Sequence, residues 1–161
     1  MIHAQASITI SRSPATVFEY VAEGFFRNYP NWSPEVLSVQ AISEGPVKVG
    51  TRGKQVRLDM GVRTECEFRI SRFEPGRRVD FRCISVPLLS SYLMEASGNN
   101  TRLTFIVEYS GSTLLLGPFR RKIDKTMQKG SEQVVSNIKA LLESAVDALS
   151  DPAGQPVRHR A

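Results

Sequence analysis

The stretch FRRKIDKTMQKGSEQVVSNIKALLESAVDAL, residues 119–149, decides the fold of this 161-residue chain. Its apolar residues recur at spacings of three and four, the period of one face of an α-helix. At 1.5 Å per residue such a helix is roughly 45 Å long. We therefore predict one long helix that needs a large apolar surface to cover it. The apolar stripe consists of Phe119, Ile123, Met127, Gly130, Val134, Ile138, Leu141 and Ala145.

A series of strands before this helix supplies the surface. Residues 2–10 alternate between apolar and polar side chains, as a half-buried strand requires. Ser13-Pro14 then predicts a helix start, and the aromatic-rich residues 25–34 predict a second short helix or irregular cover. The fold class is therefore α+β, with a curved antiparallel sheet of about seven strands around the C-terminal helix. Further strands are predicted at 36–43, 51–59, 62–74, 77–86, 90–96 and 101–110.

Two turns predict the same inner face of the sheet independently. Residues 75–76 are Pro-Gly and residues 97–100 are Ser-Gly-Asn-Asn, both well suited to tight turns between strands. Each turn places apolar residues of its two strands opposite each other on one side. The predicted pairs are Phe68–Cys83, Ile70–Phe81, Met94–Leu103 and Tyr92–Phe105.

The turn at Met60-Gly61 leaves two registers open. A two-residue loop turns Gln55 and Arg57 inward, whereas a three-residue loop turns Val56 and Leu58 inward. We favour the longer loop, because it avoids burying a cation without a partner.

Composition excludes several classes of protein. There are 21 basic and 16 acidic residues, and the one dense basic run is Arg120, Arg121, Lys122, Lys125 and Lys129. The run is read as a solvated helix face in which Asp124 pairs with Arg120, and the alternative is guidance of an anionic ligand or a membrane headgroup. No nucleic-acid-binding motif accompanies it, so no nucleic-acid partner is expected.

The few cysteines and histidines indicate the compartment and limit the chemistry. Cys66 and Cys83 share the predicted inner face and are expected to be reduced. His3 and His159 are the only histidines, which argues against a metal site or a histidine-based triad. The chain has no secretory signal and no stretch that could span a membrane, so we expect a cytoplasmic protein.

Several short segments, in their order along the chain, resemble the START-like, or SRPBCC, superfamily and most closely its polyketide cyclase/dehydrase-like branch. The resemblance implies a helix-grip fold in which the sheet and the long helix enclose a hydrophobic cavity. It also implies one START-like domain over residues 1–150, and we expect residues 151–161 to be a poorly ordered tail. The segments are SPATVFEYV (13–21), NWSPEV (31–36), VGT (49–51), FEPGRRV (73–79) and NTRLT (100–104).

The inward-facing residues are candidates to line that cavity, although each could equally belong to a filled core. Tyr92 is the preferred polar contact, with Tyr20, Tyr29 and Tyr109 as alternatives. Gly130 is unfavourable inside a helix and therefore hints at space or close approach beneath it. The candidate ligand-binding residues are Trp32, Phe68, Phe81, Tyr92, Met94, Phe105, Ile123, Met127 and Gly130.

The leading functional hypothesis is binding of a small hydrophobic molecule, lipid- or polyketide-like, in this cavity. The first alternative is a polyketide cyclase or dehydratase in which Tyr92 donates a proton; cyclases of the superfamily often place histidine in the cavity, and this chain has none there. The second alternative is a protein-interaction module, and a homodimer is left open. The sequence indicates no cofactor and no metal.

Overall fold

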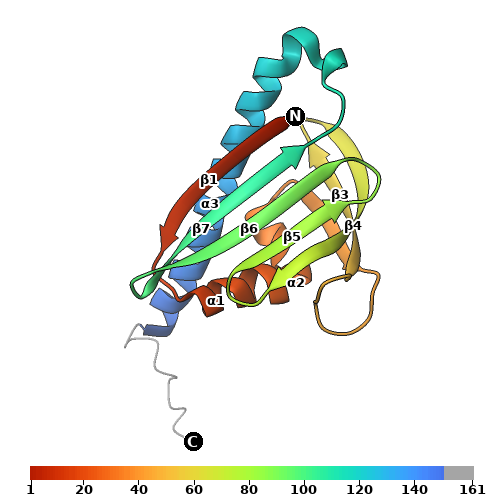
Figure 1. Cartoon of the computed structure of the whole chain (residues 1–161). Helices are drawn as coiled ribbons and strands as arrows, with labels where there is room; N and C mark the ends of the chain where they lie inside the picture. The colour runs from red at the N-terminus through yellow and green to blue at the C-terminus, as the bar shows by residue number, and fades with distance from the viewer. Residues whose placement is uncertain (151–161) are drawn as a thin grey trace, which may run out of the picture.

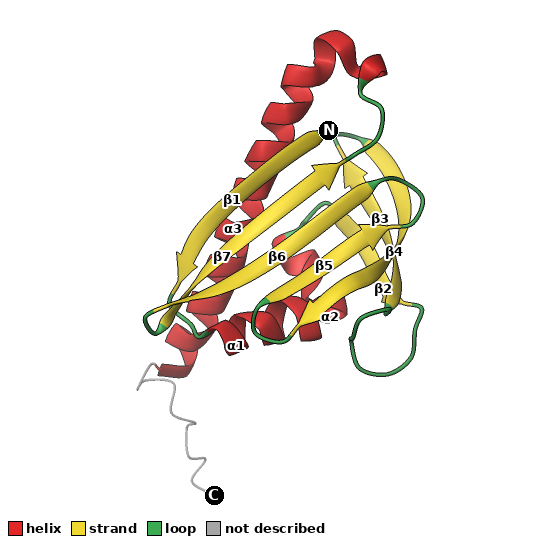
Figure 2. Ribbon diagram, in the orientation of Figure 1, coloured by secondary structure: helices red, strands yellow, loops and turns green. Residues whose placement is uncertain are grey.

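The computed structural model describes residues 1–150 and contains one seven-stranded antiparallel sheet that curves in front of a long C-terminal helix (Figure 1 and Figure 2). The predicted α+β helix-grip architecture is confirmed, whereas the predicted tail at 151–161 lies outside the described residues. The strands are β1 (Ile2–Ile10), β2 (Val36–Ala41), β3 (Arg52–Asp59), β4 (Val62–Glu74), β5 (Arg78–Cys83), β6 (Leu88–Ser97) and β7 (Asn100–Tyr109). The helical segments are α1 (Pro14–Phe18), η1 (Glu19–Glu23), α2 (Phe25–Trp32), η2 (Leu114–Phe119) and α3 (Arg120–Ser150). No helix within residues 1–150 is long and apolar enough to cross a membrane.

The strand order is β1-β7-β6-β5-β4-β3-β2. The short helices α1, η1 and α2 connect β1 to β2, which lie at opposite edges of the sheet. β1 pairs with β7 at one edge, and β2 pairs with β3 at the other. The helix start at Ser13 is as predicted, because the backbone N–H of Thr16 donates to Ser13 Oγ at 3.3 Å and Pro14 takes the first helical position.

The inner face of the sheet has the predicted parity. Next to the β4–β5 turn the register differs, since Glu74 pairs with Arg78 and a bulge after Ile70 restores the predicted alignment farther along. The confirmed pairs are Phe68–Cys83, Ile70–Phe81, Met94–Leu103 and Tyr92–Phe105.

The favoured register at the β3–β4 turn is wrong. Asp59 pairs with Val62, so the loop has only two residues, Met60 and Gly61, with φ values of 51° and 81°. Positive φ at both central residues is the backbone of a type I′ turn. Arg57 consequently faces the interior and Leu58 is 44% exposed. The argument against burying Arg57 fails because this side chain has partners, described below.

The predicted helical stripe faces the sheet from Met127 onward, because Met127, Gly130 and Val134 line the cavity described below. Ile138 is fully buried, and Val135 and Leu142, which lie beside the predicted stripe, are buried as well. Phe119 is 64% exposed and belongs to η2, while the side chain of Ala145 lies outside the description. The first turns of α3 therefore do not cover the sheet in the way that the rest of the helix does.

Helix α3 also covers the edge of the sheet along β1 (Figure 1). Three of its side chains donate to backbone carbonyls of this strand and of Met1, the residue before it, which satisfies acceptors that would otherwise be exposed at the sheet edge. The bonds run from Arg120 Nη2 to Met1 O (2.9 Å), from Gln128 Nε2 to Gln5 O (2.9 Å) and from Lys139 Nζ to Thr9 O (2.6 Å).

A carboxylate fixes the other end of α3. Glu143 Oε1 accepts from the backbone N–H of Ser11 at 3.0 Å and from its hydroxyl at 2.7 Å. Lys139 Nζ donates to the same oxygen at 2.9 Å. Hydrogen bonds from Lys139 and Ser11 favour the ionised carboxylate and lower the pKa of Glu143 to about 2.

Candidate functional site

A cavity of about 490 Å³ lies between the inner face of the sheet, α2 and the N-terminal half of α3. Its volume is within the range of small-molecule sites. Met60, at the β3–β4 turn, lines it and is 75% exposed, so the cavity opens to solvent at this end of the sheet.

Aromatic rings form the apolar wall of the cavity. Phe25 of α2 stacks on Phe81 of β5 with ring centroids 4.2 Å apart. The ring centroids of Tyr92 on β6 and Phe105 on β7 are 4.8 Å apart, and Phe68 lies edge-on to Phe81. Offset and edge-to-face contacts of this kind stabilise a packed aromatic surface. The wall is thus rigid and apolar, with rings supplied by neighbouring strands of the sheet and by α2.

The structure brings most of the predicted site residues together around this cavity. Met94 and Ile123 are not among the lining residues. Met94 has the predicted inward parity but lies two residues beyond Tyr92 on β6, within the packed core. Ile123 is half-buried on α3. The predicted residues that line the cavity are Trp32, Phe68, Phe81, Tyr92, Phe105, Met127 and Gly130.

Gly130 adjoins open space. A Cβ atom placed there would meet no other atom within 4 Å. The sequence suggested either open space beneath the helix at Gly130 or a close approach of another element, and the structure shows open space.

One side of the cavity carries a polar group of residues, which includes Tyr29, an alternative polar contact in the sequence analysis, and Arg57, which the favoured register placed in solvent. Arg57 Nε and Nη2 each donate to the carboxylate of Asp59 at 3.0 Å, and Nη1 donates to the hydroxyl of Tyr29 at 2.7 Å. Glu35 lies 4.0 Å from the guanidinium. Burial opposes the charge on Arg57, but the hydrogen bond to Asp59 and the nearby negative charge outweigh it and raise the arginine pKa. Arg57 therefore stays charged inside the site.

The sequence did contain a signal for this group. Residues 57 and 59 are an Arg-x-Asp pair, and side chains two apart in a strand lie on the same face. The carboxylate that compensates the inward guanidinium was therefore present two positions farther along the same strand.

Tyr92 contributes a second polar group. It is 3% exposed, and its hydroxyl accepts a hydrogen bond from the indole N–H of Trp32 at 3.3 Å. Burial raises the pKa of Tyr92 well above its ordinary value, so the phenol keeps its proton. Tyr92 lines the cavity, and its hydroxyl, with the indole as its donor, retains a proton that it can donate to a bound oxygen atom.

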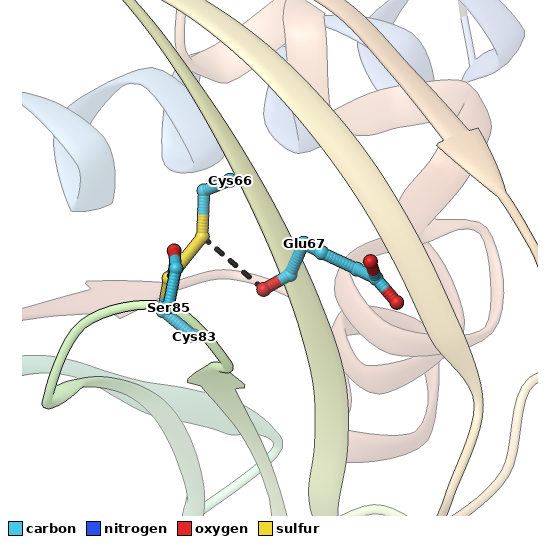
Figure 3. Close-up of a disulfide and its surroundings, with 4 residues drawn as sticks. All are labelled: Cys66, Glu67, Cys83 and Ser85. Atoms are coloured by element: carbon cyan, nitrogen blue, oxygen red, sulfur yellow. Dashed lines mark hydrogen bonds between the residues drawn. A yellow bond between two sulfur atoms is a disulfide. The ribbon is translucent and has the colours of Figure 1, made fainter.

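The two cysteines form a disulfide in the cavity wall, so the expectation of reduced thiols is wrong (Figure 3). Cys66 and Cys83 are 6.4 Å apart between Cα atoms, and Cys66 Sγ lies 3.4 Å from the carbonyl oxygen of Glu67. Their diagonal placement across β4 and β5, predicted from the hairpin register, allows the bond to form.

The disulfide lies where the β3–β4 hairpin separates from β5. Cys83 ends β5 and pairs with Phe68, and residues 62–67 of β4 pair with β3 alone in the described sheet. The disulfide and the hydrogen bond from Ile84 N to Glu67 O (2.8 Å) tie this arm back to β5. The arm includes Arg57 on β3, so the disulfide helps to position the polar side of the cavity.

Comparison with known proteins places the chain among proteins of related shape. The family model described as polyketide cyclase / dehydrase and lipid transport matches residues 1–143. No curated protein matches the sequence.

Solved structures agree with the fold at low sequence identity. Zhui aromatase/cyclase from Streptomyces sp. R1128 has a TM-score of 0.73 at 14% identity, covering 92% of this chain and 97% of that one. TTHA0849 from Thermus thermophilus has a TM-score of 0.71 at 17% identity, with coverages of 89% and 98%. Ara h 8.0201 has a TM-score of 0.66 at 15% identity, with coverages of 88% and 97%. At these identities the likeness concerns the fold alone.

Proposed function

Because the chain belongs to the polyketide cyclase / dehydrase and lipid transport family, we propose that it binds a small hydrophobic, lipid- or polyketide-like molecule in the cavity. The observation that carries the proposal is the cavity of about 490 Å³ itself, with aromatic rings on one wall and polar groups on another. An apolar guest gains about 25 cal/mol for each Å² of surface removed from water. Binding energy would therefore come mainly from burial.

The polar groups define the oxygen-bearing part of the guest. Arg57 has five N–H groups and uses three of them on Asp59 and Tyr29, which leaves two for a ligand. Tyr92 offers its hydroxyl proton from another part of the lining. We infer a guest with an extended or fused apolar body and an oxygen acceptor, anionic or carbonyl, near Arg57.

Native mass spectrometry of the protein purified from its own source tests the proposal, followed by a thermal-shift panel of apolar compounds with and without a carboxylate. A co-purified apolar molecule, or a rise in melting temperature with apolar acids, supports it. A protein that is consistently empty and does not respond to any of the compounds contradicts it.

An enzymatic role in the same cavity is the second candidate, and the protonated phenol of Tyr92 is the observation that favours it. A cyclase or dehydratase needs a positioned proton donor beside a folded polyketide chain, and proximity within the cavity supplies much of the remaining rate. Turnover of a polyketide-like substrate that is lost in Tyr92→Phe would place catalysis above simple binding. An interaction module with a filled interior is less well supported, because the cavity is open.

A cytoplasmic location remains a prediction. The Cys66–Cys83 disulfide argues against it, since such bonds persist mainly in oxidising compartments. Fractionation of the source cells, with thiols blocked before lysis, tests both the location and the redox state.

A further inference from the structure

Exposed apolar side chains collect at the end of the molecule where the cavity opens. The β3–β4 turn, the β5–β6 loop, the start of β1 and η2 all lie at this end of the sheet (Figure 1). In the part of the chain that the structure describes, seven of the eleven large apolar residues that are exposed lie in these segments or directly beside them. They are Met1, Met60, Val62, Ile84, Val86, Leu114 and Phe119.

Two of these side chains protrude beside the first turn of α3. Leu114 is 90% exposed and Phe119 is 64% exposed, at the two ends of η2. Neither lines the cavity. Concentrated exposure of apolar side chains is typical of surfaces that contact another apolar phase.

A cationic surface adjoins the apolar one. Arg121, Lys122, Lys125 and Lys129 lie on α3, while Asp124 is paired with Arg120 at 3.2 Å. Cations near a helix N-terminus oppose the helix dipole, so a negatively charged partner would relieve an unfavourable arrangement. The basic run, which the proposed ligand site does not use, thus favours an anionic surface.

Acidic residues also lie at this end. Asp59 is held by Arg57, and Glu108 lies 3.3 Å from His3. Glu132 accepts a hydrogen bond from Gln128 at 3.1 Å. Residues 120–132 of α3 nevertheless carry five basic and two acidic side chains, so this part of the helix presents net positive charge to an approaching anionic surface.

We infer that this end of the molecule docks on an anionic lipid bilayer. Leu114 and Phe119 enter the headgroup boundary, and Arg121 and Lys122 contact lipid phosphates. An apolar segment flanked by cations is the composition of interfacial membrane contacts, and the few side chains involved make the contact reversible. Docking in this orientation brings the mouth of the cavity at Met60 close to the lipid, so an apolar guest could exchange with little exposure to water. The contact itself needs no guest and goes beyond the proposed ligand binding.

Sedimentation with vesicles tests the inference on the full chain without added ligand. The protein is mixed at low salt with phosphatidylcholine vesicles, alone or with about one third phosphatidylglycerol, to give an anionic surface. We expect binding to the anionic vesicles only, reversed by high salt. Arg121→Gln with Lys122→Gln should weaken binding roughly 30-fold, because each basic residue near an anionic surface contributes severalfold.

The apolar contribution needs its own variant and matched controls. Leu114→Ser with Phe119→Ser should also weaken binding to anionic vesicles. Val49→Ser removes an exposed apolar side chain from the β2–β3 loop at the opposite end and should leave binding unchanged.

The charge control is Lys48→Gln with Arg77→Gln, two basic residues in loops at that same opposite end. Thermal unfolding and the binding of an uncharged apolar dye verify that every variant is folded and retains its cavity.

Three outcomes overturn the inference: no binding to anionic vesicles, equal binding to both kinds of vesicle, or equal losses in the test and control variants. Sedimentation velocity adds a fourth, because a dimer dispersed by Leu114→Ser with Phe119→Ser would assign this surface to a second copy of the chain. Dye binding is measured separately, so failure of docking and failure of the ligand site are distinguishable.

Discussion

Arg57 and Asp59 lie on the same face of β3, and the guanidinium donates two hydrogen bonds of 3.0 Å to the carboxylate within the cavity lining. This relationship keeps a permanent positive charge beside an aromatic wall. It also gives the site a preference that burial of apolar surface alone would not provide.

Arg57→Gln should weaken the binding of an anionic apolar probe and leave the binding of a neutral one unchanged. A hydrogen bond to a charged group contributes enough for roughly a ten-fold or larger loss in affinity for anilinonaphthalene sulfonate. Neutral N-phenylnaphthylamine lacks the sulfonate and should bind as before. Fluorescence titration of both probes measures the difference, and an equal loss for both would mean that Arg57 acts through the shape of the site.

Gly130 allows the cavity to be filled without disturbing the core. Gly130→Ala meets no neighbour and should raise the free energy of unfolding by about 1 kcal/mol through helix propensity. Gly130→Leu should fold equally well but bind both probes more weakly, because the leucine side chain can occupy the cavity. Urea unfolding and the same titrations measure the two effects. Undiminished binding by the leucine variant would contradict the assignment of this space to the ligand.

Tyr92→Phe should remove one hydrogen bond and leave the wall intact. The indole N–H of Trp32 loses its acceptor, at a cost of about 1 kcal/mol in the free energy of unfolding. Trp32 is the only tryptophan in the chain, so its fluorescence reports the change directly. Tyr109→Phe, outside the cavity lining, is the control and should leave the emission of Trp32 unchanged.

Reduction of the Cys66–Cys83 disulfide should destabilise the fold. The two residues are 17 apart in sequence, and closing a loop of that length stabilises a protein by about 3 kcal/mol through the unfolded state. Urea unfolding with and without dithiothreitol measures the difference. The Cys66→Ser, Cys83→Ser variant should resemble the reduced protein and ignore the reductant; a further response to dithiothreitol would show that the reagent acts elsewhere.

Glu143 should make stability sensitive to acid. Its pKa falls from 4.5 to about 2 on folding, so its contribution is complete above pH 4.5 and is lost as the pH falls toward 2. Glu143→Gln should therefore lose less stability than the parent between pH 5 and about pH 3 in urea unfolding. Glu23→Gln, an exposed carboxylate on η1, serves as the control. Equal acid sensitivity of parent and Glu143→Gln would contradict the role of this contact.

The pairing within the hairpins of the sheet could be predicted from local sequence, because the position of each turn fixes which residues of its two strands lie opposite each other. Pairing Phe68 with Cys83 needed only a turn position and the two-residue period of a strand, and the bulge near the turn left that pair in place. The same logic placed Tyr92 opposite Phe105. The family resemblance and the helix-grip architecture agree with the family match and with the solved structures.

The polar part of the site does not follow from the register argument alone, because the energetic penalty for an interior cation favours a solvent-facing Arg57 unless a partner compensates its charge. Asp59, two residues farther along β3 and on the same face, is that partner. The contact with Tyr29 joins α2 to β3, and no local pattern predicts such a tertiary contact. The hairpin register places Cys66 and Cys83 close enough for a disulfide, whereas a cytoplasmic location favours reduced thiols, so the register and the expected compartment lead to opposite predictions.

The three hydrogen bonds from α3 to β1 and to Met1, the residue before it, make the two sides of the cavity mechanically unequal. On one side, helix and strand move together, since separating them breaks contacts at Met1, Gln5 and Thr9. On the other side, the β3–β4 arm extends past β5 with few cross-links. A guest larger than the resting space would therefore be accommodated by outward bending of this arm, and differences in guest size should appear there as changes in amide exchange.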